Sequence, residues 1–344
     1  MKTYYCIDSF CGAGGMSLGF QSAGFCIACA FDHDPASIAT YKRNLGDHAF
    51  TADAHDVDGN WIKEHSTPRG QRADVLIGGP PCQGFSVQRR GADIDPRNDL
   101  VKEFSRIVDE VRPRFFVMEN VVGLLSSRGD GALSYLRKSA TKSGYILHQK
   151  KLDAYEYGIP QHRKRVIIVG EQLEGPFVRF AFPRPPESYI RERTVRSWIG
   201  DLQSLSESDI PNHRADRLSP TNLERIRSLK AGQDRTHLPK HLQLSTHQKN
   251  PSHRHLDVYS RMSWDLPART ITARFDSFSR GQFGHPVLDR SITLREGARL
   301  QTFPDTFTFA GTKVEVARQI GNAVPPMLAT AIAQQIFRCL NDTE

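Results

Sequence analysis

Short apolar runs alternate with amphipathic stretches through the first half of the chain. The apolar runs predict strands at Tyr4–Ser9, Cys26–Phe31, Val75–Ile77, Phe115–Met118, Tyr145–Leu152 and Arg165–Val169. The amphipathic stretches predict helices at Met16–Ala23, Pro35–Leu45, Phe104–Val111 and Ala132–Ser143. Strands that alternate with helices in this way are typical of a parallel, doubly wound α/β sheet. We therefore expect an α/β fold for this half.

The pattern changes near Pro183. From there to about Asp265 the chain is polar and has little aliphatic periodicity, and residues 211–262 hold ten Lys/Arg, four Asp/Glu and six His. Periodicity returns at Thr270–Ala273, and Pro326–Leu340 predicts a last helix with an apolar face. We expect three parts: a sheet domain, a smaller basic domain, and a segment that returns to the sheet domain, over residues 1–182, 183–310 and 311–344.

A glycine-rich turn, Phe10-Cys11-Gly12-Ala13-Gly14-Gly15, separates the first predicted strand from the first helix. Glycines let the backbone approach a ligand closely at a helix N-terminus. Asp32 ends the second strand, where a carboxylate can accept hydrogen bonds from ribose hydroxyls. Ser17 stands where a dinucleotide motif has its third glycine. The turn therefore predicts a nucleoside-type ligand, with a nicotinamide cofactor or a turn without ligand as alternatives.

A second loop presents a cysteine. The strand over Asp74–Pro81 runs through Gly78-Gly79-Pro80-Pro81 into Cys82. Loops after strand ends form the ligand crevice of open α/β sheets, and the two prolines fix the direction of the approach. A rigidly placed thiol in a polar loop suits a nucleophile. A buried structural cysteine is the alternative interpretation.

An acid and two arginines follow at other strand ends. Glu119 comes directly after the strand Phe115–Met118 and would point into the same crevice, unless it caps a helix or forms a salt bridge. Arg163 and Arg165 lie two residues apart at a strand edge and so point to one side. A solvated basic strand would give the same spacing.

Five motifs together resemble the DNA (cytosine-5)-methyltransferase family, in the order and spacing of that family. They are Phe10–Gly15, Gly79-Pro80-Pro81-Cys82-Gln83, Glu119-Asn120-Val121, Gln161–Arg165 and Gln319–Pro326. The resemblance covers residues 1–182 and about 266–344. It implies a Rossmann-like, S-adenosylmethionine-dependent methyltransferase domain with a smaller DNA-recognition domain.

The resemblance also implies a pocket for S-adenosylmethionine, with S-adenosylhomocysteine as the product. The residues implied to line it are Phe10, Gly12, Gly14, Asp32, His33, Asp53, Ala54, Asn322 and Val324. Asp32 would hold the ribose, His33 would lie against the adenine, and Asp53 near its exocyclic amine. The family more often has Glu in place of Asp32 and a larger aromatic in place of His33, so cofactor affinity could differ.

The implied chemistry begins at Cys82. C5 of cytosine is a poor nucleophile, but a thiolate added at C6 turns C5 into an enamine carbon. Glu119, protonated in a desolvated pocket, would relieve the negative charge at N3. Arg163 would hold the cytosine O2, and Arg165 would fix that geometry or favour the thiolate. The base that removes the C5 proton is not identified, although a bound water would serve.

Double-stranded DNA is the implied substrate, with the target base flipped out of the stack. The residues expected to contact DNA are Gln83, Ser86, Arg89, Arg90, Arg269 and Thr272. Arg89 and Arg90 lie in Val87–Asn98, which suits a loop that closes over DNA but also an exposed basic loop. The basic middle segment would read the sequence, because arginine is the commonest reader of guanine. The recognised bases do not follow from the sequence.

No metal site is expected. Six histidines, at 213, 237, 241, 247, 253 and 255, have no cysteine nearby and no finger spacing, so polar or DNA-facing roles are favoured. Cys26-x-x-Cys29 lacks a second pair, which favours buried core thiols. Six scattered cysteines, no apolar run of membrane length and no signal-peptide pattern predict a cytoplasmic protein. The family resemblance implies that it is bacterial and nucleoid-associated. The net charge of +8 favours an anionic partner.

Three other functions stay open. A tRNA cytosine-5 methyltransferase would share Cys82 and Glu119, and the long basic segment favours DNA over it. A catalytically silent DNA-binding regulator would not need the intact Cys82, Glu119, Arg163 and Asn322. A nicotinamide oxidoreductase leaves the cysteine loop unexplained. Family habit suggests a restriction–modification system with a separate companion endonuclease, although a solitary methyltransferase fits equally. One unit acting on one base predicts a monomer.

Overall fold

A computed structural model describes residues 2–81, 100–127, 129–174, 179–245 and 257–341. The chain divides into two compact units. The sheet unit consists of Met1–Tyr157, Lys164–Pro186 and Val324–Glu344, and the small unit of Gly158–Arg163 and Glu187–Ala323. The cysteine loop predicted to carry the nucleophile, residues 82–99, lies outside the described residues.

The sheet unit is built on seven strands in the order β3-β2-β1-β4-β5-β7-β6. Their bounds are β1 Tyr5–Ser9, β2 Cys26–Asp32, β3 Ala49–Thr51, β4 Val75–Gly78, β5 Phe115–Val121, β6 Tyr145–Asp153 and β7 Lys164–Gln172. The strands from β3 to β5 pair in parallel, as predicted. This α/β architecture confirms the fold class expected from the sequence.

The expectation of a wholly parallel sheet is wrong at one end. Strand β7 lies between β5 and β6 and pairs antiparallel with both. A parallel return needs a crossover of about a dozen residues or more. Only ten residues, 154–163, join β6 to β7, and four of them form the 3-10 helix Ala154–Tyr157. The short connection therefore reverses the chain direction.

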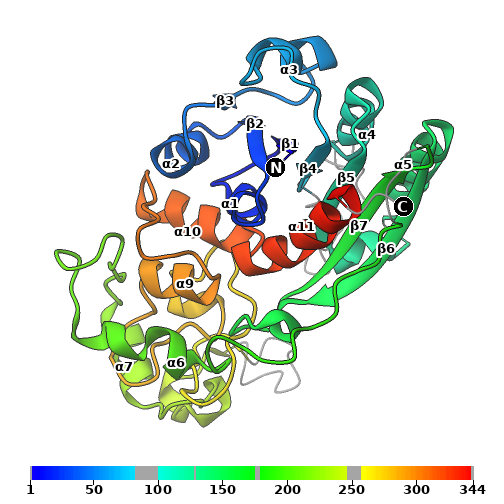
Figure 1. The fold of residues 1–344 in the computed structure, drawn as a ribbon. Coiled ribbons are helices and arrows are strands. Elements are labelled where there is room, and N and C mark those ends of the chain that lie inside the picture. The colour runs from blue at the N-terminus through cyan, green and yellow to red at the C-terminus, as the bar shows by residue number, and fades with distance from the viewer. Residues whose placement is uncertain (1, 82–99, 128, 175–178, 246–256, 342–344) are drawn as a thin grey trace. The chain divides into compact units, whose positions relative to one another are not determined.

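Helices cover both faces of this sheet (Figure 1). The bounds are α1 Gly15–Ser22, α2 Pro35–Leu45, α3 Gly59–His65, α4 Leu100–Val111, α5 Asp130–Lys142 and α11 Pro326–Asn341, with a 3-10 helix at Val122–Leu125. Helix α1 packs closely on α11, since a Cβ on Gly19 would lie 2.4 Å from that of Ala329. The short elements β3 and α3 were not predicted, because seven residues or fewer carry little periodicity.

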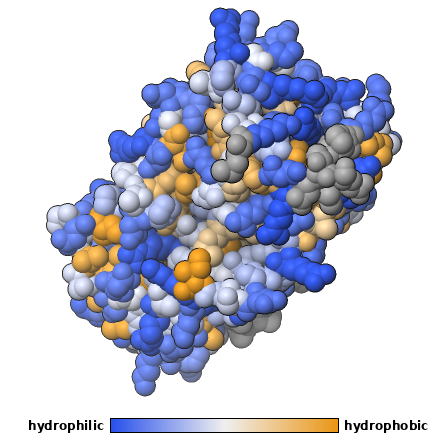
Figure 2. Space-filling model, viewed as in Figure 1, coloured by the Kyte–Doolittle hydropathy of each residue, from blue (hydrophilic) through white to orange (hydrophobic). Residues whose placement is uncertain are grey.

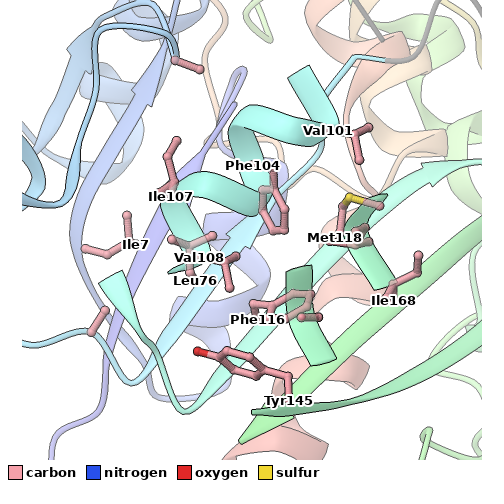
Figure 3. Close-up of a cluster of buried hydrophobic side chains, with 14 of the residues drawn as sticks. Ile7, Leu76, Val101, Phe104, Ile107, Val108, Phe116, Met118, Tyr145 and Ile168 are labelled. Carbon is pink, nitrogen blue, oxygen red and sulfur yellow. The ribbon is translucent and has the colours of Figure 1, made fainter. Parts of the chain in front are cut away.

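Helices α4 and α5 pack over the face of the sheet that holds its main apolar cluster (Figure 3). Phe104 of α4 meets Phe116 of β5 edge-on, with ring centroids 5.9 Å apart. Phe116 pairs across the sheet with Gly170 of β7. A Cβ at Gly170 would lie only 1.9 Å from the Phe116 ring, so the aromatic ring fills the space that a side chain would need.

The small unit contains helices and loops, with only isolated bridges among its described residues. Its helices are α6 Val195–Ile199, α7 Pro220–Arg227, α9 Leu294–Leu300 and α10 Lys313–Asn322. Its 3-10 helices are Gly200–Ser204, Arg235–His237, Lys240–Leu242 and Phe278–Arg280. Buried arginines replace strand pairing: Arg295 donates to the carbonyls of Pro211, Pro304 and Phe307.

The outer surface is mainly polar on the face shown in Figure 2, where apolar residues appear in small groups. The longest helix among the described residues, α11, has 16 residues. That falls short of the roughly 20 apolar residues of a membrane span. Within the described parts of the chain, no helix has the length and apolarity to span a bilayer.

We expect Gly170→Ala to destabilise the sheet unit by about 1–3 kcal/mol, because the new methyl group must displace the Phe116 ring. Chemical denaturation would measure the loss. Phe116→Leu in the Gly170→Ala background should recover part of it, since the smaller side chain makes room. Purely additive effects of the two substitutions would contradict a direct steric conflict.

Candidate functional site

A pocket of about 370 Å³ opens at the carboxyl ends of the parallel strands in the sheet unit. Its lining residues are Phe10, Phe31, Asp32, His33, Ala52, Asp53, Ala54, His55, Pro81 and Leu100. The first nine follow β1 to β4 or end those strands, and Leu100 opens α4. Ligands of open α/β sheets bind at this edge. The structure thus brings together five residues singled out from the sequence: Phe10, Asp32, His33, Asp53 and Ala54.

The glycine turn is held to the end of β2 by the Asp32 carboxylate. One oxygen accepts from the backbone N–H of Gly12 at 2.9 Å, and the other from that of Asp34 at 2.9 Å. Gly12 has a φ of 52°, and a Cβ built there meets no atom within 4 Å, so its outer side is open. Gly14 differs, because its Cβ would lie 2.3 Å from Leu45 of α2. Gly14 is therefore required by packing and does not line the described pocket.

Two carboxylate–histidine pairs stand at the pocket. His33 Nδ1 lies 3.2 Å from Asp32 Oδ1, and His55 Nδ1 lies 2.7 Å from Asp53 Oδ1. The hydrogen bond to Asp32 raises the pKa of His33, and that to Asp53 raises the pKa of His55. Backbone and side-chain hydrogen bonds from His55 lower the pKa of Asp53. The sequence analysis did not single out His55. The signal that could have identified it is its position two residues after Asp53 in a turn, where an Asp side chain often bonds to the residue two positions on.

A buried polar chain underlies the glycine turn. Asp8 of β1 is 1% exposed and accepts a hydrogen bond from Ser17 Oγ at 2.6 Å. Ser17 in turn accepts from the Tyr41 hydroxyl at 2.8 Å, and His48 Nε2 lies 3.2 Å from that hydroxyl. Burial raises the pKa of Asp8 to about 7, against the hydrogen bond from Ser17 and helped by the charge of Asp32. Ser17, which stands in place of the third glycine of a dinucleotide motif, therefore has a structural role as the hydrogen-bond partner of Asp8 and Tyr41.

An ion pair lies at the end of β5. Arg165 Nε on β7 is 2.8 Å from Glu119 Oε1, although the angle is not that of an aligned hydrogen bond. Glu119 is 8% exposed, and a Cβ at Gly79 would lie 3.6 Å from its other oxygen. Asn120 donates to the carbonyl of Pro80 at 3.2 Å. The Glu119–Arg165 pair is thus beside the chain that leaves β4. A salt bridge was the alternative considered for Glu119, and its role at a base stays a prediction.

Arg163 belongs to the small unit and is buried there. Its Nη1 donates to the carbonyl of Ile271 at 2.9 Å, and its Nη2 to those of Gly321 and Ala323 at 2.9 and 3.0 Å. Gln161 adds bonds to Leu300 and Gln301. These contacts hold the ends of several loops together. The observed partners of the Arg163 side chain are backbone carbonyls. Its contact with the cytosine base stays a prediction.

The remaining predicted residues are distributed as follows. Arg269, Thr272 and Asn322 are exposed in the small unit, and Val324 is buried in the sheet unit. Cys82, Gln83, Ser86, Arg89 and Arg90 lie outside the described residues, as do three of the six histidines, His247, His253 and His255.

The structure also bears on possible metal sites and on the state of the thiols. Across the described ranges, no group of three His, Cys, Asp or Glu side chains is arranged to hold a metal ion. Cys29 is buried, but Cys26 is exposed at the start of β2. The expectation that both are core thiols is therefore wrong for Cys26, because the first residue of the strand precedes its buried stretch.

The sequence and the structure both resemble known proteins. Residues 4–338 match the family model described as C-5 cytosine-specific DNA methylase. The Type II methyltransferase M1.HphI of Haemophilus parahaemolyticus is 37% identical over 96% of this chain and 86% of its own length. The Type II methylase M.HgiDII of Herpetosiphon aurantiacus is 34% identical over 97% of this chain and 95% of its own.

Two solved structures have a similar fold. A DNA modification methyltransferase encoded within a prophage of E. coli superposes with a TM-score of 0.73 at 26% identity, over 99% of this chain and 100% of its own. The methyltransferase EhMeth of Entamoeba histolytica gives a TM-score of 0.69 at 16% identity, over 99% of this chain and 100% of its own, which shows a common fold.

We expect Asp8→Asn to flatten the pH dependence of stability between about pH 4 and 7. The raised pKa means that the folded state binds the Asp8 proton more tightly than the unfolded state does, so wild-type stability falls as pH rises through this window. The full effect is on the order of 4 kcal/mol at most, from a shift of about three units. Guanidinium denaturation at several pH values measures it, and parallel curves for the two proteins would contradict the assignment.

Proposed function

Because this chain belongs to the C-5 cytosine-specific DNA methylase family, we propose that it methylates C5 of a flipped-out cytosine in a specific duplex DNA sequence through a covalent Cys82 adduct. The chain is a C5 cytosine DNA methyltransferase of the Type II restriction–modification kind, like relatives that are 31–37% identical over nearly its whole length. The proposal adds the cofactor, the residues and their roles. The pocket at the strand ends is the observation that carries it.

The pocket residues fit S-adenosylmethionine, the methyl donor that the family and fold imply. Carboxylates suit the polar edges of a nucleoside, and two of them lie at the carboxyl ends of neighbouring strands: Asp32 ends β2, and Asp53 follows β3. Phe10, Pro81 and Leu100 supply apolar walls for the rings. Asp32 would hold the ribose and Asp53 the exocyclic amine of adenine, with His33 and Ala54 beside the base. When bound, the cofactor supplies an electrophilic methyl group.

The chain's own residues act on the cytosine. The Cys82 thiolate forms a bond to C6, and the electron pair of the C5–C6 double bond makes C5 nucleophilic. Glu119 would hold a proton at N3, where negative charge would otherwise develop; this role requires the carboxyl group to be protonated in the complex, in place of the ionised form that pairs with Arg165. After C5 has gained the methyl group, loss of the C5 proton restores the double bond and expels Cys82. The water or side chain that takes this proton is still unidentified.

The ion pair suggests a change in the roles of the two arginines. Arg165 stands against Glu119, so it is the better candidate to hold the cytosine O2. Arg163, with its Nη1 and Nη2 bonded to three carbonyls, would act by fixing the loops around Ile271 and Gly321. A guanidinium suits both tasks, because its planar fork binds several oxygens at fixed geometry.

Double-stranded DNA is the proposed partner of the basic segments. Exposed Arg269 and Thr272 would support contact with it, as would Gln83, Ser86, Arg89 and Arg90 beside Cys82. We further propose that the enzyme acts as a monomer and that a companion endonuclease, where one exists, acts as a separate protein. The two alternatives are a tRNA substrate and a catalytically silent DNA-binding role. The following experiment distinguishes both of them from DNA methylation.

We expect wild-type protein to transfer label from methyl-labelled S-adenosylmethionine to duplex DNA as 5-methylcytosine, and Cys82→Ser to transfer none. Total tRNA is the parallel substrate. Cys26→Ser is the matched control, because it removes an exposed thiol on β2 and should keep full activity. Label in tRNA alone would move the protein to the RNA substrate, and no label in either would favour the silent regulator.

Glu119→Gln should lower kcat by about 10²- to 10⁴-fold, the usual contribution of a positioned general acid. Binding of S-adenosylhomocysteine, measured by calorimetry, should stay within about twofold, since Glu119 does not line the described pocket. A loss of cofactor affinity equal to the loss of kcat would contradict the role of Glu119 at the base.

A further inference from the structure

One arginine joins the two walls of the pocket in the sheet unit. Arg106 lies in α4, and its Nη2 donates to the backbone carbonyls of Ala54 at 2.8 Å and Val57 at 2.9 Å. Ala54 lines the pocket on the side that follows β3, whereas Leu100 lines it from the first turn of α4. The Arg106 side chain thus spans from the helix of one wall to the backbone of the other.

Two glutamates of the same helix orient this side chain. Arg106 Nε donates to Glu103 at 2.9 Å, and Nη1 donates to Glu110 at 2.9 Å. Glu110 uses its second oxygen to accept from the backbone N–H of Gly59, the first residue of α3, at 2.9 Å. Helix α4 therefore holds three backbone groups of residues 54–59 through one Arg–Glu pair.

The charge of Arg106 is secure. Burial opposes it, but the hydrogen bonds to Glu110 and Glu103 outweigh burial and raise the pKa of Arg106 further. A charged donor to carbonyls makes a stronger hydrogen bond than a neutral one. Lysine could not replace it, because a single ammonium group cannot reach two carbonyls and two carboxylates in a fixed fork.

The loop would survive the loss of these contacts. The side chains of Ala54 and Val57 are 4% and 1% exposed and belong to the apolar cluster beneath α4. Apolar packing therefore keeps the loop folded, while Arg106 sets where its backbone lies. The backbone it sets is the one that carries Asp53 and His55.

We propose that Arg106 is a positioning residue for the cofactor: it fixes the distance between the Asp53–His55 wall and α4, and so lets Asp53 recognise the exocyclic amine of the adenine. The inference rests on the proposed function of the pocket. Arg106 touches neither cofactor nor substrate in this proposal, and acts through the backbone of Ala54 and Val57.

The test is calorimetric binding of two ligands to the full chain. S-adenosylhomocysteine carries the amine, and S-inosylhomocysteine has a carbonyl oxygen in its place. We expect Arg106→Lys to raise the Kd for S-adenosylhomocysteine about tenfold, the value of one or two lost hydrogen bonds to a charged group. The Kd for S-inosylhomocysteine should rise less, so the preference for the amine shrinks. Arg112→Lys, which loses one bond to the carbonyl of Ser143, should leave both values unchanged.

An equal rise for both ligands, or no rise, would overturn the inference, because general damage to the pocket does not distinguish them. If Arg106→Lys fails to fold, Glu103→Gln weakens the same orientation more gently; a reduced preference then supports the inference and an unchanged one overturns it. If the wild-type protein fails to bind S-adenosylhomocysteine, that result would contradict the proposed function of the pocket, and the inference about Arg106 would fail with it.

Discussion

The antiparallel pairing of β5 with β7 is the constraint on which the catalytic edge of the sheet depends. Its register sets Phe116 opposite Gly170 and Val121 opposite Arg165. Side chains alternate between faces along a strand, so a slip of one residue would carry Arg165 to the other face and press a bulkier residue against Phe116. The steric fit at Gly170 and the ion pair at Glu119 are therefore two consequences of one register.

The parallel strands supply the complementary half of the site. Asp32 and Asp53 follow neighbouring strands, and both are kept ready by local hydrogen bonds, from Gly12 and Asp34 in one case and His55 in the other. Helix α4 holds the backbone of the loop that carries Asp53 through Arg106, and on our proposal this contact sets how far Asp53 lies from the helix. The direction of the parallel strands thus places the pocket at their carboxyl ends. On our proposal, the contacts of helix α4 set the width of that pocket.

Sequence reasoning reached the parts of this site that are local in the chain. The glycine turn, Asp32 and Glu119 each stand at a strand end that periodicity marks. Periodicity does not encode strand direction, however, so the sequence did not predict that β7 runs antiparallel. The physical reason for the reversal is the short connection between β6 and β7. The backbone partners of Arg163, such as Ile271 and Gly321, could not be predicted, because they lie more than a hundred residues away and leave no trace in its own neighbourhood. The partner of Asp8, Ser17, comes from the next element.

The small unit shows why a count of basic residues overstates the surface available to DNA. At least three of the described Lys/Arg in residues 211–262 serve the fold: Arg235 is 5% exposed, Arg225 donates to the Leu242 carbonyl, and Arg261 donates to four carbonyls. With only isolated bridges in the described part of this unit, the guanidinium groups of Arg225 and Arg261 satisfy carbonyls that strands would otherwise pair. On the proposed function, exposed members such as Arg214 and Arg217 are the better candidates to read the DNA sequence, because a guanidinium committed to its own backbone has fewer donors left for a base edge.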